Sequence, residues 1–143
     1  MKILIIPFAV LLLSAQSFAA DDEDTSDINA ELKSIRHLIY KEQYARAIND
    51  LISIVFTNSD NADAWNLLGY ASRKDGKLQK SAEAYEKALA IDPNHKGALA
   101  YQGELFLALG QRARAEDNLD KLGGLCPEGC GELEDLADAL ADR

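Results

Sequence analysis

The chain has 143 residues, and its 15 basic and 24 acidic residues give a formal net charge of −9 at pH 7. This length predicts a single folded domain. A strongly acidic chain repels nucleic acid and anionic lipid at long range, and the sequence contains no basic patch that would offset this repulsion. The composition therefore argues against a protein that binds DNA or RNA.

The first 19 residues have the pattern of a secretory signal peptide. Lys2 precedes an apolar run over residues 3–13, and Ser17 and Ala19 occupy the small-residue places before a cleavage site. The run is too short for a bilayer core of about 30 Å, which needs roughly 20 residues, so cleavage after Ala19 is favoured over an uncleaved anchor. We expect a periplasmic or secreted protein without stable membrane insertion after cleavage.

Residues 20–27 follow the expected cleavage site and consist of acidic and small residues. The segment has no large apolar side chain to bury, and such a composition predicts a disordered acidic leader. A divalent-cation site is disfavoured here because a cation needs rigid, spaced oxygen ligands.

Three units with a common 34-residue interval follow the leader, at residues 28–61, 62–95 and 96–129. Within the middle unit, two apolar stripes at helical spacing flank the turn dipeptide Asp75-Gly76. Pro93 ends the second stripe, because the residue before a proline resists the helical conformation. Each unit is therefore predicted to form two helices joined by a tight turn.

The small residues at fixed places explain how the two helices of a unit approach each other. Helices pack about 8–10 Å apart only if the side chains at their crossing allow it. In the middle unit these small residues are Gly69, Ser81 and Ala88. A shift of 34 residues places Gly69 on Gly103, which the third unit keeps.

The middle unit resembles the tetratricopeptide repeat family. The residues that carry the resemblance are Trp65, Leu68, Gly69, Ser81, Tyr85, Ala88 and Pro93. The similarity covers residues 28–129, although Leu99 replaces the tryptophan in the third unit and Ser59 replaces the proline in the first. The resemblance implies an all-α, right-handed superhelical solenoid of antiparallel helix pairs. Three repeats are the usual minimum for a stable stack, and the end repeats are often atypical.

The segment 130–143 is predicted to form a helix that caps the third repeat. Leu133, Leu136 and Leu140 lie on one helical face. Glu132 and Glu134 fall in the first turn, where the helix dipole favours negative charge.

The resemblance also implies a concave groove lined by the first helix of each repeat. The residues carried over as the groove that binds a partner are Arg36, Ile39, Tyr40, Asp63, Asn66, Tyr70, Arg73, Lys74, Glu104 and Leu107. Tyrosine and arginine often dominate interface energy, and an extended peptide or a helix of another protein is the expected ligand. Some relatives bind acidic chaperone termini through a basic clamp, but Leu32, Ala100 and Glu104 occupy clamp places here, so that partner is rejected.

Cys126 and Cys130 are the only two cysteines. In an exported protein, a four-residue separation across a turn favours a structural disulfide. Redox activity and soft-metal binding to the same two thiols remain alternatives, although neither a Cys-x-x-Cys motif nor a second cysteine pair is present.

The sequence predicts no catalytic residue and no cofactor. It contains neither a phosphate-binding loop nor a dinucleotide fingerprint, and no nucleophile or orienting acid is spaced to serve His37. The predicted function is therefore a non-catalytic scaffold or adaptor that binds another protein, in the assembly of a cell-envelope complex. The competing hypothesis is a small periplasmic thiol protein that uses Cys126 and Cys130. The oligomeric state is left open.

Overall fold

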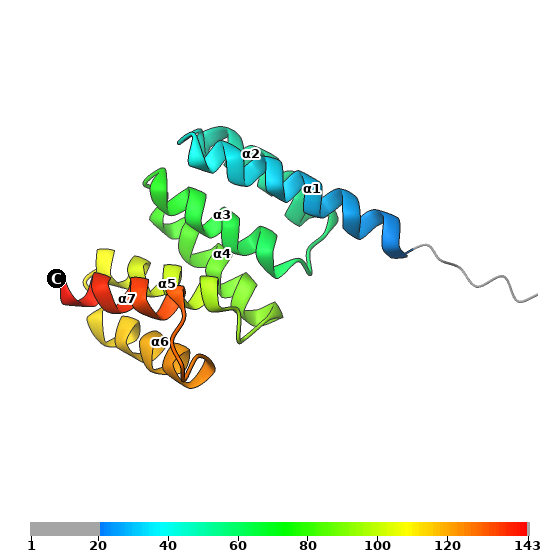
Figure 1. Ribbon diagram of the computed structural model, residues 1–143. Coiled ribbons are helices and arrows are strands. Elements are labelled where there is room, and N and C mark those ends of the chain that lie inside the picture. The colour runs from blue at the N-terminus through cyan, green and yellow to red at the C-terminus, as the bar shows by residue number, and fades with distance from the viewer. Residues whose placement is uncertain (1–20, 143) are drawn as a thin grey trace, which may run out of the picture.

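The computed structural model describes residues 21–142, and the predicted signal peptide with its cleavage site lies outside this range. The described residues form seven helices (Figure 1): α1 (Asp21–Tyr40), α2 (Tyr44–Thr57), α3 (Ala62–Lys74), α4 (Leu78–Ile91), α5 (Lys96–Ala108), α6 (Arg112–Leu125) and α7 (Gly131–Ala141). None of the helices in this part of the chain is long and apolar enough to cross a membrane.

The predicted all-α fold of antiparallel helix pairs is confirmed. Helices α2, α4 and α6 begin at residues 44, 78 and 112, and α3 and α5 begin at residues 62 and 96. Each repeat therefore restarts its helices after 34 residues. Helices α1, α3 and α5 follow one another in a row, and α7 lies against α5 and α6 (Figure 1).

The acidic segment after the expected cleavage site differs from the prediction of disorder. Helix α1 begins at Asp21, so residues 21–27 belong to its first two turns. Carboxylates near a helix N-terminus interact favourably with the helix dipole. An acidic composition is therefore compatible with the start of a helix. The absence of large apolar residues had instead favoured the prediction of disorder.

The turn inside each repeat uses a residue in the left-handed conformation. These residues are Glu42, Gly76 and Gly110, with φ angles of 57°, 77° and 72°. The next residue in each turn donates its N–H back across the helix end, and Lys77 reaches the Ser72 carbonyl at 2.8 Å. This hydrogen bond satisfies a carbonyl that the helix leaves free. Glutamate lacks the freedom of glycine at positive φ, so the first turn is strained where the other two are not.

Gly69 and Gly103 mark equivalent notches that are filled from different helices. A Cβ atom at Gly69 would lie 2.5 Å from Cε1 of Tyr85, which belongs to the second helix of the same repeat. A Cβ atom at Gly103 would instead lie 2.6 Å from Cδ1 of Leu136 in α7. Leu119 stands in the place of Tyr85 in the third repeat, and α7 supplies the side chain that fills the Gly103 notch. Helix α7 is therefore part of the core.

The serine that replaces the usual alanine in the middle repeat makes a buried hydrogen bond. Ser81 is fully buried, and its hydroxyl donates to the Gly69 carbonyl at 2.8 Å. A buried hydroxyl needs such a partner. The bond joins α4 to α3 beside the Gly69 notch.

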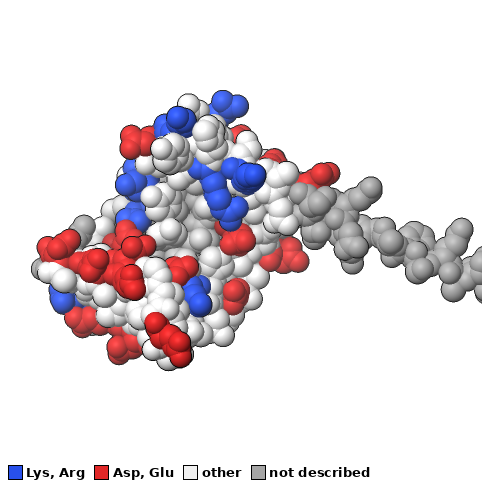
Figure 2. Space-filling model, in the orientation of Figure 1, with Lys and Arg blue, Asp and Glu red and all other residues white. Residues whose placement is uncertain are grey.

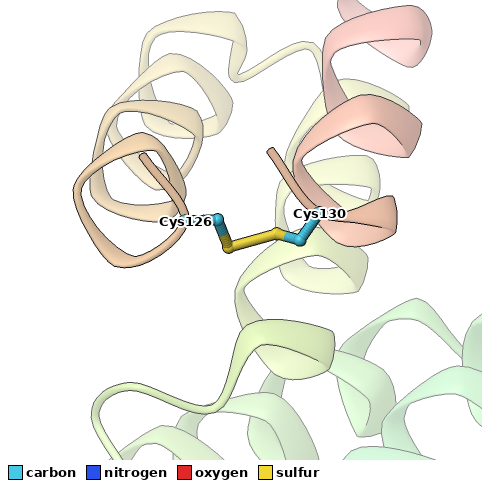
Figure 3. The surroundings of a disulfide bond; sticks show 2 residues. All are labelled: Cys126 and Cys130. Carbon is cyan, nitrogen blue, oxygen red and sulfur yellow. A yellow bond between two sulfur atoms is a disulfide. The ribbon is translucent and has the colours of Figure 1, made fainter. Parts of the chain in front are cut away.

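A disulfide connects the end of α6 to the start of α7. Cys126 and Cys130 are bonded, with their Cα atoms 5.9 Å apart (Figure 3). Gly129 lies between them with a φ of 93°, and its N–H donates to the Cys126 carbonyl at 2.9 Å. The bond therefore fixes the tight loop that directs α7 onto the third repeat.

Candidate functional site

A hollow of about 490 Å³ lies over α1 and α3 and reaches the edge of α5. Its lining residues are Arg36, Ile39, Tyr40, Glu42, Tyr44, Leu67, Tyr70, Lys74 and Tyr101. Half of the ten predicted groove residues are in this set. We call this hollow, defined by these nine residues, the tyrosine hollow.

Four tyrosines give the tyrosine hollow its aromatic character. Tyr70 and Tyr101 contact each other edge to face, with ring centroids 4.9 Å apart. Burial raises the pKa of Tyr101, and the neighbouring Tyr70 adds to this effect, so the hydroxyl stays neutral and can serve as a hydrogen-bond donor. Tyr40 is 79% exposed at the outer edge of the hollow. Aromatic rings with polar tips, one of them largely exposed to solvent, suit a ligand that is partly apolar.

Basic side chains gather at the α1 and α3 end of the molecule, whereas acidic side chains cover α7 (Figure 2). Arg36 and Lys74 line the tyrosine hollow, with Glu42 as the one acidic residue in its lining. Lys41 lies over the Tyr40 ring, with its Nζ 5.5 Å from the centroid. The hollow therefore carries a local excess of positive charge on an otherwise acidic protein.

Arg73 was predicted as a groove donor, but the structure engages it in a brace between α3 and α5. Its Nη2 lies 2.7 Å from Oε2 of Glu104, and the Arg73 side chain is only 16% exposed. Burial alone would lower the pKa of Arg73, but neighbouring Tyr85 and Glu104 raise it above its ordinary value. The guanidinium therefore stays charged and holds Glu104, another predicted groove residue, in place.

Asp63 lies apart from the tyrosine hollow, in a polar network at the start of α3. His95 accepts a hydrogen bond from the Ala98 N–H at its Nδ1 and caps α5, with a distance of 3.1 Å. With Nδ1 as the acceptor, Nε2 carries the proton and donates to Oδ1 of Asp63, also at 3.1 Å. Arg36 approaches the other oxygen of Asp63 at 4.0 Å. The carboxylate of Asp63 therefore connects neighbouring repeats.

Two predicted groove residues are buried. Asn66 is only 7% exposed. Leu107 is also 7% exposed, and it belongs to the apolar cluster that contains Leu136 and Leu140 of α7. The prediction of Leu107 as an open contact was wrong because α7 covers the inner side of α5. The open part of the groove is consequently its α1 and α3 end.

Sequence reasoning missed Leu67 and Tyr101. Both are the sixth residue of their repeats, a place that the family's groove pattern leaves out, and both line the tyrosine hollow. Their shared position was visible in the 34-residue register. Tyr44, at the start of α2, was missed because the predicted groove used only the first helix of each repeat.

The two cysteines and the possible metal ligands bear on the hypothesis of a thiol or metal site. Cys126 is buried and Cys130 is half-buried, and their sulfur atoms are bonded to each other in the disulfide. Between residues 21 and 142, no group of three or more His, Cys, Asp or Glu side chains is arranged to hold a metal ion. The site with the most developed geometry is therefore the tyrosine hollow.

Comparisons with known proteins give a family and a fold. Residues 32–96 match the family model described as tetratricopeptide repeat. The chain is 29% identical over 108 residues to cellulose synthase 1 operon protein C of Komagataeibacter xylinus, covering 76% of this chain and 8% of that protein. The curated relatives are much longer proteins, of which the chain matches 5–8%.

Two solved structures show the same arrangement of helices. The structure of MamA, residue 41 to the end, from Desulfovibrio magneticus RS-1 matches with a TM-score of 0.64 and 26% identity, covering 69% of this chain and 56% of that chain. The type III secretion translocator chaperone SycD of Yersinia enterocolitica matches with a TM-score of 0.70 and 15% identity, covering 82% of this chain and 88% of that chain.

Proposed function

We propose that this chain, which belongs to the tetratricopeptide repeat family, is a scaffold that binds an extended peptide of another protein in the tyrosine hollow. The observation that carries the proposal is the coincidence of four tyrosines and two basic side chains around one hollow of about 490 Å³. Pockets that bind ligands are typically apolar or aromatic with a few placed polar groups. The likeness to SycD, whose name calls it a chaperone, agrees with protein binding but reflects the fold alone.

The chemistry of the tyrosine hollow favours a peptide that joins an apolar side chain to a carboxylate. Tyr40, Tyr70 and Tyr101 offer ring faces and edges for an aromatic, proline or aliphatic residue. Arg36 and Lys74 offer charge to an acidic side chain or a carboxyl terminus. The acidic residues of α7 repel such a ligand from the other end of the molecule, so electrostatics direct it toward α1 and α3.

Selection from a displayed library of random peptides tests this specificity. We expect enriched sequences to carry an acidic residue within a few positions of an aromatic, proline or aliphatic residue, and their binding to weaken as salt is raised. Enrichment of basic peptides, or no enrichment over the unselected library, would contradict the proposal.

A pair of charge reversals locates the binding. Lys74→Glu places a carboxylate in the tyrosine hollow and should weaken binding of an enriched acidic peptide by at least about tenfold. Lys87→Glu makes the same change in overall charge on the exposed surface of α4, outside the hollow. It should change the affinity less than about threefold, because only screened long-range charge is altered. Equal losses in the two variants would show that net charge alone governs binding.

We further propose that the protein works as an adaptor in an exported compartment of the cell envelope, where disulfides persist. The support is the signal-like sequence of residues 1–19 together with the bond between Cys126 and Cys130. Expression of the full chain in a bacterial host, followed by mass measurement of the protein from the periplasmic fraction, tests this. The expected mass is that of a chain whose first residue is Ala20, and an uncleaved chain retained in the cytosol would contradict export.

A further inference from the structure

An apolar surface lies between α2 and α4, away from the tyrosine hollow. A hollow of about 300 Å³ separates these helices, and α3 lines it with Trp65 and Leu68. Ile52 borders the hollow and is 39% exposed, and Phe56, one helical turn further along α2, is 87% exposed. Residues four apart share a helix face, so Phe56 is an exposed aromatic beside an apolar depression. We call this surface the α2–α4 face.

The next repeats show that this apolar character is peculiar to the first one. The residues equivalent to Ile52 and Phe56 are Glu86 and Ala90 in the middle repeat. Asn118 takes the place of Ala84 between α4 and α6, and its amide donates to the Leu99 carbonyl at 2.9 Å. The repeat fold itself therefore does not require large apolar residues at these places.

We propose that the α2–α4 face pairs with the same face of a second copy of this chain. An exposed phenylalanine lies beside a depression that can receive an apolar side chain, and a two-fold axis would bring each Phe56 to the depression of its partner. A self-complementary patch is the property that a two-fold interface needs. A different protein would have to supply its own protruding apolar group.

Charge agrees with this assignment. The whole chain carries a net charge of −9, which disfavours approach of two copies through most of the surface. The rim of the hollow carries one base and one acid, Lys80 and Glu83, so the α2–α4 face has no net charge at its centre. The centre of this face therefore adds no local charge repulsion between two copies.

The size of the α2–α4 face predicts weak association. Helix α2 has 14 residues, a length of about 21 Å, and two helix widths of about 10 Å each give on the order of 400 Å² a side. Interfaces of this size are typical of weak, transient complexes. The pair should consequently form in the micromolar range or above, and it should leave the tyrosine hollow of each copy open.

Sedimentation of the full chain over a range of protein concentrations tests the pairing. The average mass should rise from one copy toward two, and Phe56→Ser should weaken this association by at least about tenfold. Tyr40→Ser is a matched control, because Tyr40 is an equally prominent aromatic at 79% exposure in the tyrosine hollow. That variant should pair normally and lose affinity for an enriched peptide, which separates this proposal from the proposed function.

A cross-link identifies the occupant of the α2–α4 face directly. A photoreactive amino acid at position 56, in a mixture of ¹⁴N- and ¹⁵N-labelled chains, should yield cross-linked peptides of mixed isotope that map to α2, α3 or α4. A single-copy mass at every concentration would overturn the proposal. So would equal loss of pairing in the Phe56 and Tyr40 variants, or mixed-isotope cross-links only to other surfaces.

Discussion

The two ends of the inner wall have the same repeat geometry but differ in what they expose. At the α1 and α3 end, Tyr40, Tyr70 and Lys74 line an open hollow. At the α5 end, α7 covers the wall, with Leu136 in the Gly103 notch and Leu107 buried in the same cluster. Arg73 and Glu104 form the boundary between the two ends.

This difference shows that family groove places define a wall but not its accessibility. A cap helix that completes the core of the last repeat also removes part of the wall from solvent. Residues at equivalent places therefore contribute to binding at one end and to stability at the other.

The largest expected effect is on stability at the closed end. Leu136→Ala removes a fully buried side chain from the Gly103 notch and should cost about 2–5 kcal/mol of unfolding free energy. Tyr40→Ala, at the open end, should change it by no more than about 0.5 kcal/mol. Urea unfolding measures both free energies. Similar losses in the two variants would contradict the claim that the α7 end contributes to stability and the open end does not.

The next largest effect is on binding at the open end. Tyr70→Ala removes one of the aromatic rings that line the tyrosine hollow. The variant should bind an enriched peptide about 2 kcal/mol, or roughly 30-fold, more weakly. Glu134→Ala changes an exposed residue of α7 and should leave the affinity within about threefold of the wild type. Calorimetric titration of both variants distinguishes the ends, and a larger loss for Glu134→Ala would reverse the assignment.

Tyr85, which neighbours Arg73 at the boundary between the ends, should make the unfolding free energy depend on pH. Burial raises the pKa of its hydroxyl in the folded protein, while Arg73 opposes this effect. An unfolded tyrosine titrates near pH 10, so the contribution of Tyr85 to stability is fully present below pH 10 and is lost as the pH rises further.

Tyr85→Phe removes this titration. The ring that fills the Gly69 notch is unchanged in this variant, so its stability at pH 7 should lie within about 1 kcal/mol of the wild type. By pH 11 the wild type should have lost about 1.4 kcal/mol more than the variant. Urea unfolding at pH 7, 10 and 11 tests this, and parallel losses in both proteins would show that Tyr85 does not titrate on unfolding.

The smallest effect concerns the strained turn at the open end. Glu42 has a φ of 57°, where the equivalent turns have Gly76 and Gly110. Glu42→Gly should stabilise the protein by about 0.5–1 kcal/mol, because relief of strain exceeds the added entropy of the unfolded chain. Gly76→Ala should destabilise it, and thermal unfolding can measure both changes. A loss of stability in Glu42→Gly would show that the side chain has another structural role.

The repeats could be predicted from the sequence because their signals are local. Gly69, Tyr85 and Pro93 each act through the packing or the conformation of neighbouring residues, and a 34-residue register multiplies the signal. The pairing of Cys126 with Cys130 follows similarly from a short separation across a turn.

The accessibility of the site could not be predicted, because it depends on contacts between distant segments. Leu107 looks like a groove residue until α7 packs on α5, and Arg73 looks like a free donor until Glu104 lies beside it. Tyr101 was missed because its sixth place is outside the family's groove pattern. The start of α1 was missed because acidic residues suit both a disordered leader and a helix N-terminus.

The most direct test of the account is a backbone amide NMR titration of the full chain with an enriched peptide. The largest shifts should fall on the C-terminal half of α1 and on α3, around Tyr40 and Tyr70, while α7 and the α2–α4 face should change little. Largest shifts on α7, or on the surface around Phe56, would contradict the claim that the tyrosine hollow is the binding site.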